Sequence, residues 1–128
     1  MIPSFGTDGI RGHAGTEPLT PQTLIHIGKA IALSAGENPL IIIGMDTRES
    51  GHWICDALCK GIMSVGGNIL FGGVMPTAAV SCATIGEKAQ RGIMITASHN
   101  PFHDNGIKIF ANSGRKLNTD QQERLLHS

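Results

Sequence analysis

The sequence predicts a three-layer α/β domain, in which helices flank both faces of a mixed, mainly parallel sheet. Continuous aliphatic runs at residues 40–43, 68–71 and 93–95 are short and bounded by glycine or polar residues, as expected of strands buried on both faces. Helical patterns lie between these runs. Because strand and helix alternate, we expect parallel strands joined by right-handed crossovers, within one domain of 128 residues.

The first two helices are marked by their ends and by one apolar stripe each. Thr20 is the expected N-cap of the first, with Pro21 at the first helical position and Gly36 as its stop. Ser50 is the expected N-cap of the second, which Gly66 ends. The inward positions, three and four residues apart, are Leu24, Ile27, Ile31 and Ala35 in the first helix and Ile54, Ala57, Leu58, Gly61, Ile62 and Val65 in the second.

The later elements follow in order along the chain. A third helix is expected at residues 77–88, after Pro76. Residues 106–111 alternate as a strand does, and we expect them to pair antiparallel with residues 93–97. Thr119 opens a last helix, with Gln122 three residues on as a capping box. The chain stops at Ser128 within that helix, as we expect of a domain cut from a longer protein.

Composition excludes several classes of function. Lysine plus arginine and aspartate plus glutamate number 10 each, so the chain lacks the cationic surface of a nucleic-acid binder and suits a small polar or anionic ligand. No apolar run approaches the roughly 20 residues that span a bilayer, and no signal-peptide pattern opens the chain. The 3 cysteines do not suggest a secreted disulfide framework. We therefore expect a cytoplasmic protein with no nucleic-acid or membrane partner.

A buried-strand pattern ends abruptly at Ser98, His99 and Asn100, and Pro101 cannot continue a helix or a ladder. A turn of this kind exposes a hydroxyl at the carboxyl end of a strand, where ligands of parallel sheets bind. The loops at residues 46–50 and 72–77 follow the other two strands and are expected at the same edge of the sheet.

Three interpretations of the Ser98 turn are open. A serine hydrolase would use Ser98, His99 and Asp104, but adjacent side chains point in different directions and the strained elbow of such enzymes is absent. A plain turn would have Ser98, Asn100 and Asn105 bonded to their own backbone. A phosphate-handling loop explains more, because it needs an exposed oxygen, neighbouring donors and a cation such as Lys108 on the returning strand.

Two further polar segments have both a structural and a functional interpretation. Residues 5–12 place three glycines around Thr7, Asp8 and Arg11, which suits an anion held by backbone amides and a guanidinium fork but is also typical of a glycine-rich connection. Asp46 and Arg48 follow a strand, and we expect them to pair and organise that turn.

The helical spacing of His52, Cys55 and Cys59 suggests a metal site on the second helix as one hypothesis. No fourth ligand is evident, and both cysteines serve equally well as small apolar core residues. We therefore favour a structural role for them.

Five motifs in order resemble the first domain of the α-D-phosphohexomutase family, and most closely its bacterial phosphoglucosamine mutase branch. They lie at residues 5–12, 44–51, 76–80, 96–101 and 104–108, and the resemblance covers nearly the whole chain, residues 1–128. It implies an enzyme that interconverts glucosamine 6-phosphate and glucosamine 1-phosphate through a phosphoserine and a bisphosphorylated sugar.

The same resemblance implies roles for particular residues. The expected catalytic residues are Ser98, Lys108, Arg11 and His99, and the expected substrate or phosphate contacts are Asn100, Thr7, Asp8 and Gly9. Ser98 would carry the phosphate and, through it, a Mg²⁺ ion, with a sugar bisphosphate as activator.

Members of the family have four domains, and this chain matches the first. The missing domains carry the aspartate-rich metal loop, the sugar-selecting loop and the phosphate clamp, so the chain alone is expected to have little turnover. Its partners would be those domains, a hexosamine phosphate and, as a further possibility, a second copy of the chain. The same chemistry on mannose or glucose phosphates, or a stand-alone phosphate-binding module, are the alternatives.

Overall fold

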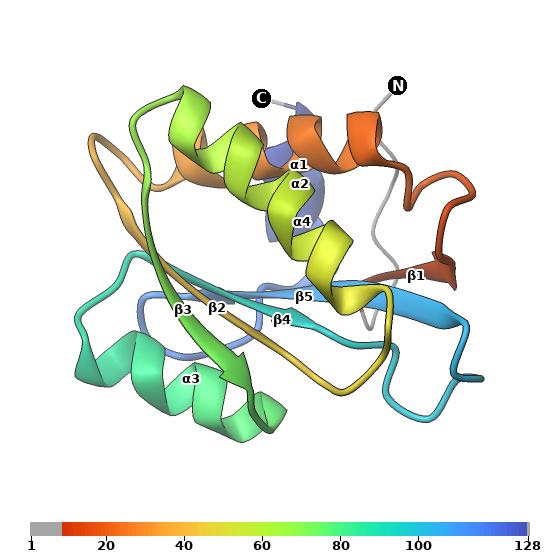
Figure 1. Ribbon diagram of the computed structural model, residues 1–128. Coiled ribbons are helices and arrows are strands. Elements are labelled where there is room, and N and C mark those ends of the chain that lie inside the picture. Colours follow the sequence, from red (N-terminus) through yellow and green to blue (C-terminus); the bar gives the residue numbers. More distant parts are fainter. Residues whose placement is uncertain (1–8, 128) are drawn as a thin grey trace.

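The computed structural model describes residues 9–127 as a five-stranded sheet with four helices around it (Figure 1). The strands are β1 (Ile10–His13), β2 (Leu40–Met45), β3 (Asn68–Val74), β4 (Arg91–Ile95) and β5 (Asp104–Ala111). The helices are α1 (Pro21–Ser34), α2 (Gly51–Ser64), α3 (Thr77–Gly86) and α4 (Thr119–His127).

The sheet has the strand order β1-β5-β4-β2-β3 and is mixed. β2 pairs parallel with both β3 and β4, whereas β5 pairs antiparallel with β4 and with β1. The return of β5 onto β4 was predicted, and it is confirmed by the register in which Ile93 lies opposite Ile109. β1 was not predicted, because 4 residues that include a glycine carry too little apolar alternation to indicate a strand.

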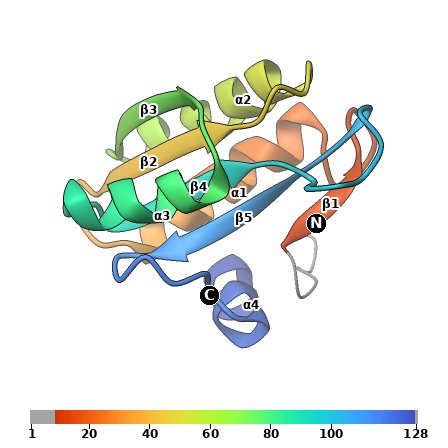
Figure 2. The same cartoon turned by 90° about the horizontal axis from the view of Figure 1, so that it is seen from below.

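The helices form a layer on each face of the sheet, which confirms the predicted three-layer α/β fold (Figures 1 and 2). α1, α2 and α4 cover one face and α3 covers the other. The larger apolar core lies under the three helices, and a smaller one, formed by Ile42, Val80, Ala89, Met94 and Phe110, lies under α3.

α1 and α2 approach each other unusually closely, because a glycine of each helix lies at their contact. A Cβ at Gly61 would collide with the carbonyl oxygen of Ile25, and a Cβ at Gly28 would collide with that of Leu58. Backbone against backbone leaves no room for a side chain at either position. The pair therefore determines how near the two helices lie.

β3 departs from its expected burial. Its aliphatic run predicts a strand buried on both faces, but β3 is the edge strand, and Leu70 and Phe71 are 43% and 48% exposed. Strand order, which local sequence does not encode, leaves an edge strand with fewer neighbours to cover it.

The helix starts were correctly located, but their capping chemistry was not. Thr20 and Ser50 precede α1 and α2, yet neither side chain caps its helix. At α4 the capping box lies one residue earlier than predicted: Asn118 Oδ1 accepts from the amide of Gln121, and Gln121 Oε1 accepts from the amide of Asn118. Gln122 is instead buried and donates to the carbonyl of Leu117.

Within residues 9–127, no helix is both long and apolar enough to cross a bilayer.

Candidate functional site

Ser98 lies at the turn that follows β4, with its side chain exposed. Its backbone is in the left-handed region, with φ of 54°, a conformation that costs a residue with a side chain about 1 kcal/mol or more. Strain of this kind persists only where neighbouring groups hold the backbone in place. Here both backbone polar groups of Ser98 are bonded: its amide donates to Thr96 Oγ1 (3.0 Å) and its carbonyl accepts from Arg48 Nη2 (2.6 Å).

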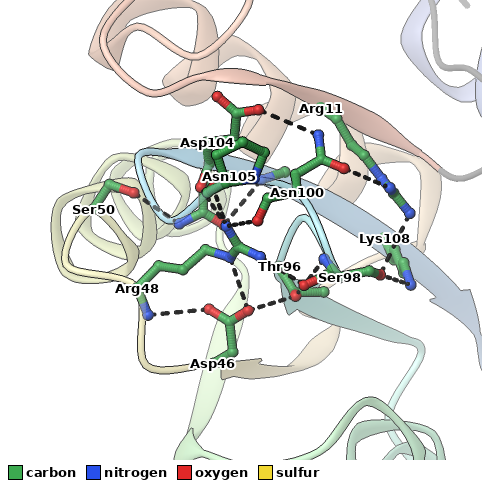
Figure 3. Close-up of polar contacts among 12 residues, drawn as sticks. Arg11, Asp46, Arg48, Ser50, Thr96, Ser98, Asn100, Asp104, Asn105 and Lys108 are labelled. Carbon is green, nitrogen blue, oxygen red and sulfur yellow. Dashed lines mark hydrogen bonds and ion pairs between the residues drawn. The ribbon is translucent and has the colours of Figure 1, made fainter.

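Arg48 is the organising residue of this turn (Figure 3). Its side chain is 7% exposed, although it lies in the loop between β2 and α2. Nη1 donates to three further carbonyl oxygens of the Ser98 loop, those of Asn100 (3.1 Å), Pro101 (2.6 Å) and Asp104 (3.1 Å). One guanidinium therefore binds four carbonyls of the segment that carries Ser98.

Asp46 completes this arrangement from the end of β2. Its Oδ2 accepts from Arg48 Nε (3.0 Å) and from Thr96 Oγ1 (2.6 Å). The predicted pairing of Asp46 with Arg48 is thus confirmed. The pair also reaches across to the neighbouring strand, because β2 and β4 are adjacent and parallel and their carboxyl ends meet at one edge.

Two cationic side chains converge on the Ser98 hydroxyl. Lys108 Nζ lies 3.0 Å and Arg11 Nη2 lies 3.4 Å from Ser98 Oγ. Lys108 comes from β5, 10 positions from Ser98 in the sequence, and Arg11 comes from β1, 87 positions away. The order of the strands in the sheet brings both side chains to one oxygen (Figure 3). Two positive charges beside an exposed oxygen favour negative charge there, as on an alkoxide or an attached phosphoryl group.

Asn100 and His99 behave differently. Asn100 is half-buried and bridges two charged groups, since Oδ1 accepts from Arg11 Nη1 (3.2 Å) and Nδ2 donates to Asp104 Oδ2 (3.3 Å). His99 is exposed, and none of the side-chain hydrogen bonds found among residues 9–127 joins it to Ser98. The geometry therefore brings cations rather than an imidazole base to the hydroxyl, unlike a hydrolase triad.

Of the glycine-rich segment at residues 5–12, residues 9–12 are among those that the structure describes. Thr7 and Asp8 lie outside the described residues. Gly9 is buried with φ of 87°, and a Cβ there would collide with the carbonyl oxygen of Ile107. Its backbone packs closely against β5 just before Arg11, so its glycine character has a structural explanation.

Several contributors to the site escaped prediction from sequence. Thr96 appeared only as part of a motif, and Asn105 was considered only as a turn residue bonded to its own backbone. Asn105 is fully buried: its Nδ2 donates to Ser50 Oγ (2.8 Å) and its Oδ1 accepts from the amide of Gly106 (2.9 Å). Ser50 thus ties the start of α2 to β5 instead of capping the helix. The one signal in the sequence is that Asn105 directly precedes the strand-like segment of residues 106–111, because a polar side chain at a buried strand needs hydrogen-bond partners.

The metal site considered on α2 does not form. Cys55 and Cys59 contact each other (Sγ to Sγ 3.9 Å), but the one group of metal-ligating side chains found in residues 9–127 lies elsewhere and excludes His52. The contact with Cys59 and burial raise the pKa of Cys55, while the contact with Cys55 lowers the pKa of Cys59. The two cysteines pack as part of the helix layer.

Comparison with known proteins places this geometry in context. Residues 3–128 match the family model described as phosphoglucomutase/phosphomannomutase, alpha/beta/alpha domain I. The phosphoglucosamine mutase of Desulforapulum autotrophicum is 49% identical over 127 residues, covering 97% of this chain and 27% of the relative. That of Nitrosospira multiformis is 48% identical over 122 residues, covering 88% and 26%.

A solved structure shows the same fold. A phosphoglucomutase/phosphomannomutase family protein of Burkholderia thailandensis superimposes with a TM-score of 0.83 at 26% identity, covering 99% of this chain and 30% of that protein. The chain thus spans about a quarter of the length of the curated relatives it matches. It belongs to the phosphoglucomutase/phosphomannomutase family, of which it has the α/β/α domain I.

Proposed function

We propose that this chain supplies the phosphate-carrying serine of a phosphoglucosamine mutase, an enzyme that interconverts glucosamine 6-phosphate and glucosamine 1-phosphate. The observation that carries the proposal is the convergence of Lys108 and Arg11 on the exposed hydroxyl of Ser98, whose backbone amide and carbonyl are both hydrogen-bonded. The phosphoglucosamine mutases of two bacteria, 48% and 49% identical to it, support the choice of sugar.

The proposed reaction consists of two successive phosphoryl transfers, first from Ser98 to the sugar and then from the sugar back to Ser98. Phosphorylated Ser98 donates its group to the free hydroxyl of the sugar: the bond from phosphorus to Ser98 Oγ breaks, and a bond from phosphorus to the sugar oxygen forms. The proton that the sugar hydroxyl loses ends on the leaving Ser98 Oγ, and the product is a bisphosphorylated sugar. After that sugar reorients, Ser98 Oγ attacks the original phosphate. The bond from that phosphorus to the sugar oxygen breaks, the sugar oxygen takes up the proton of Ser98, and Ser98 is phosphorylated again.

In this proposal, Lys108 and Arg11 stabilise the negative charge that develops during phosphoryl transfer. Positively charged groups already in place beside Ser98 Oγ stabilise the negative charge that develops on that oxygen when it leaves. Asn100 keeps Arg11 oriented. His99, exposed on the same turn, is assigned to substrate contact, and Thr7, Asp8 and Gly9 remain assigned to the phosphate by resemblance.

Mg²⁺ belongs to the proposal only through the phosphate of Ser98. Around Ser98 Oγ the side-chain contacts found in residues 9–127 come from the cations Lys108 and Arg11, and the nearby carboxylate of Asp46 is bonded to Arg48 and Thr96. This donor set does not fit a magnesium ion by itself, since Mg²⁺ prefers carboxylate, phosphate and water oxygens. Its remaining ligands would have to come from outside the described residues.

The rest of the enzyme is part of the same proposal. Phosphoryl transfer depends on positioning, and residues 1–128 span 26% of the length of the relative, so in this proposal most positioning groups come from the remaining length of the enzyme. We therefore expect little turnover from residues 1–128 alone. A sugar bisphosphate as activator, a cytoplasmic location and a homodimer also remain proposals, and we expect no nucleic-acid or membrane partner.

The test uses the full-length enzyme that contains this chain. Ser98→Ala should abolish both turnover and the incorporation of phosphate from a labelled sugar bisphosphate. Ser113→Ala, at an exposed serine on another loop, is the matched control and should retain both activities. Retention of labelling by the Ser98 variant would refute the assignment.

The role of the lysine is tested in the same way. Lys108→Met should lower kcat by about 100-fold, the loss typical when one stabilising donor of a transition state is removed. Lys60→Met, at an exposed lysine of α2, is its control. An unchanged kcat would show that Lys108 does not stabilise the transfer.

A second candidate is the same chemistry on mannose or glucose phosphates. It is favoured by the Burkholderia structure, whose family name includes both activities. Comparing kcat/KM of the full-length enzyme on glucosamine, glucose and mannose phosphates decides between them. A preference for mannose or glucose phosphate would favour this candidate.

A further inference from the structure

Two histidines and an aspartate gather where β1 and β5 meet, beside the Ser98 loop. His13 ends β1, Asp104 begins β5, and the two are partners in the antiparallel ladder. His103 directly precedes Asp104. The sheet register therefore brings a histidine from each of two distant segments to the same carboxylate.

The ligand atoms of this cluster are close enough to share one ion. His13 Nδ1 lies 3.9 Å and His103 Nε2 lies 3.6 Å from Asp104 Oδ1. The two rings are tilted by 50° with centroids 4.8 Å apart, and the three ligand atoms all lie within 4.8 Å of one another. Tetrahedral zinc with bonds of about 2.0–2.1 Å separates its ligands by roughly 3.3 Å. Both imidazoles are exposed, so small rotations of the rings can close that difference.

We propose that His13, His103 and Asp104 bind a divalent transition-metal ion, with Zn²⁺ as the preferred ion. Two imidazole nitrogens and one carboxylate oxygen are a donor set for zinc and related ions, whereas Mg²⁺ takes oxygen ligands almost exclusively. The site is therefore chemically distinct from any magnesium bound through a phosphoserine, and it does not depend on the function proposed above.

A cavity of about 340 Å³ borders the cluster and leaves room for a fourth ligand. His13, His103 and Glu49 line this cavity together with the rings of Trp53 and Phe102. Either water or the exposed carboxylate of Glu49 completes the coordination. Glutamate oxygen is an ordinary zinc ligand, and water is the usual fourth one in open sites.

The proposed site is coupled to the Ser98 loop through a single residue. Asp104 presents Oδ1 to the histidines, while its Oδ2 accepts from Asn100 Nδ2 (3.3 Å). Asn100 in turn accepts from Arg11. A bound ion holds the Asp104 carboxylate and, through it, the Asn100 amide.

The test is a titration of the 128-residue chain with zinc at pH 7.5 in the presence of millimolar Mg²⁺. We expect one zinc per chain, with Mg²⁺ failing to compete. In a spectrum of the histidine rings, the signals that move should be those of His13 Nδ1 and His103 Nε2, with a further shift of the Asn100 side-chain amide. This readout uses the unaltered protein, so it does not depend on whether a variant folds.

Variants locate the ion. His13→Asn and His103→Asn should each weaken zinc binding by at least about tenfold. Loss of a residue that only hydrogen-bonds to a metal ligand already weakens binding by about that factor, and loss of a direct ligand should cost at least as much. The matched control is His52→Asn combined with Cys59→Ser, which removes the imidazole and one of the two thiols of α2 and should leave zinc binding unchanged. Zinc binding that survives loss of both His13 and His103, or that moves only other histidine signals, would overturn the proposal.

Discussion

Replacing Arg48 with lysine should loosen the Ser98 turn without removing a positive charge. The guanidinium binds Asp46 and four loop carbonyls through Nε, Nη1 and Nη2, and a single ammonium cannot reproduce that fork. We expect the free energy of unfolding to fall.

The size of this loss follows from the contacts. Breaking a buried charged pair costs about 3–5 kcal/mol, but Asp46 is 30% exposed and loop carbonyls can bind water instead. Hydrogen bonds to charged groups contribute about 1.5–3 kcal/mol each, and lysine can retain one or two of the five. We therefore expect a loss of about 3 kcal/mol, near the lower end of the buried-pair range.

Urea unfolding of Arg48→Lys measures this loss, and amide exchange of residues 96–104 measures the order of the loop. Arg115→Lys, at an exposed arginine on another loop, is the control and should change stability by less than about 0.5 kcal/mol. A loss below about 1 kcal/mol for Arg48→Lys, with loop amides as protected as before, would show that the fork is not what holds Ser98 in its strained conformation.

Three other predictions test the packing and the ionisable groups. Gly61→Ala should lower the free energy of unfolding by about 1–3 kcal/mol, because the new methyl group collides with a carbonyl oxygen of α1. Gly86→Ala, at a position with open space around it, is the control and should leave stability unchanged or raise it slightly. Urea unfolding measures both. At mildly alkaline pH, iodoacetamide should modify Cys59 and spare Cys55, because the lowered pKa of Cys59 favours its thiolate and the raised pKa of Cys55 favours its thiol. Peptide mapping measures the modification of each, and equal labelling would contradict this prediction. The hydroxyls of Thr20 and Thr23 donate to the Glu17 carboxylate and lower its pKa, so its contribution to stability is present above pH 4.5 and is lost as the pH falls. The difference in unfolding free energy between the native chain and Glu17→Gln should therefore shrink at acid pH, and a constant difference would refute this.

Much of the fold could be predicted because its signals are local. The stripe of α2 and the aliphatic run of β2 each predict an element from spacing alone, and the structure confirms both. The short strand β1 and the exposure of Phe71 could not be predicted in this way. Both depend on which strand lies next to which, and pairing partners are remote in sequence.

The candidate site likewise has features that follow from local sequence and features that depend on the tertiary structure. The sequence by itself determined that Ser98 stands at the end of a buried strand, that Asp46 and Arg48 follow a neighbouring strand, and that a lysine returns on the strand after the Ser98 loop. Only the tertiary structure decided that Arg11 reaches Ser98 Oγ and that Arg48 binds the carbonyls of the Ser98 loop. Residue types and turns are properties of short segments, whereas the meeting of side chains 87 and 50 residues apart is a property of sheet order and register.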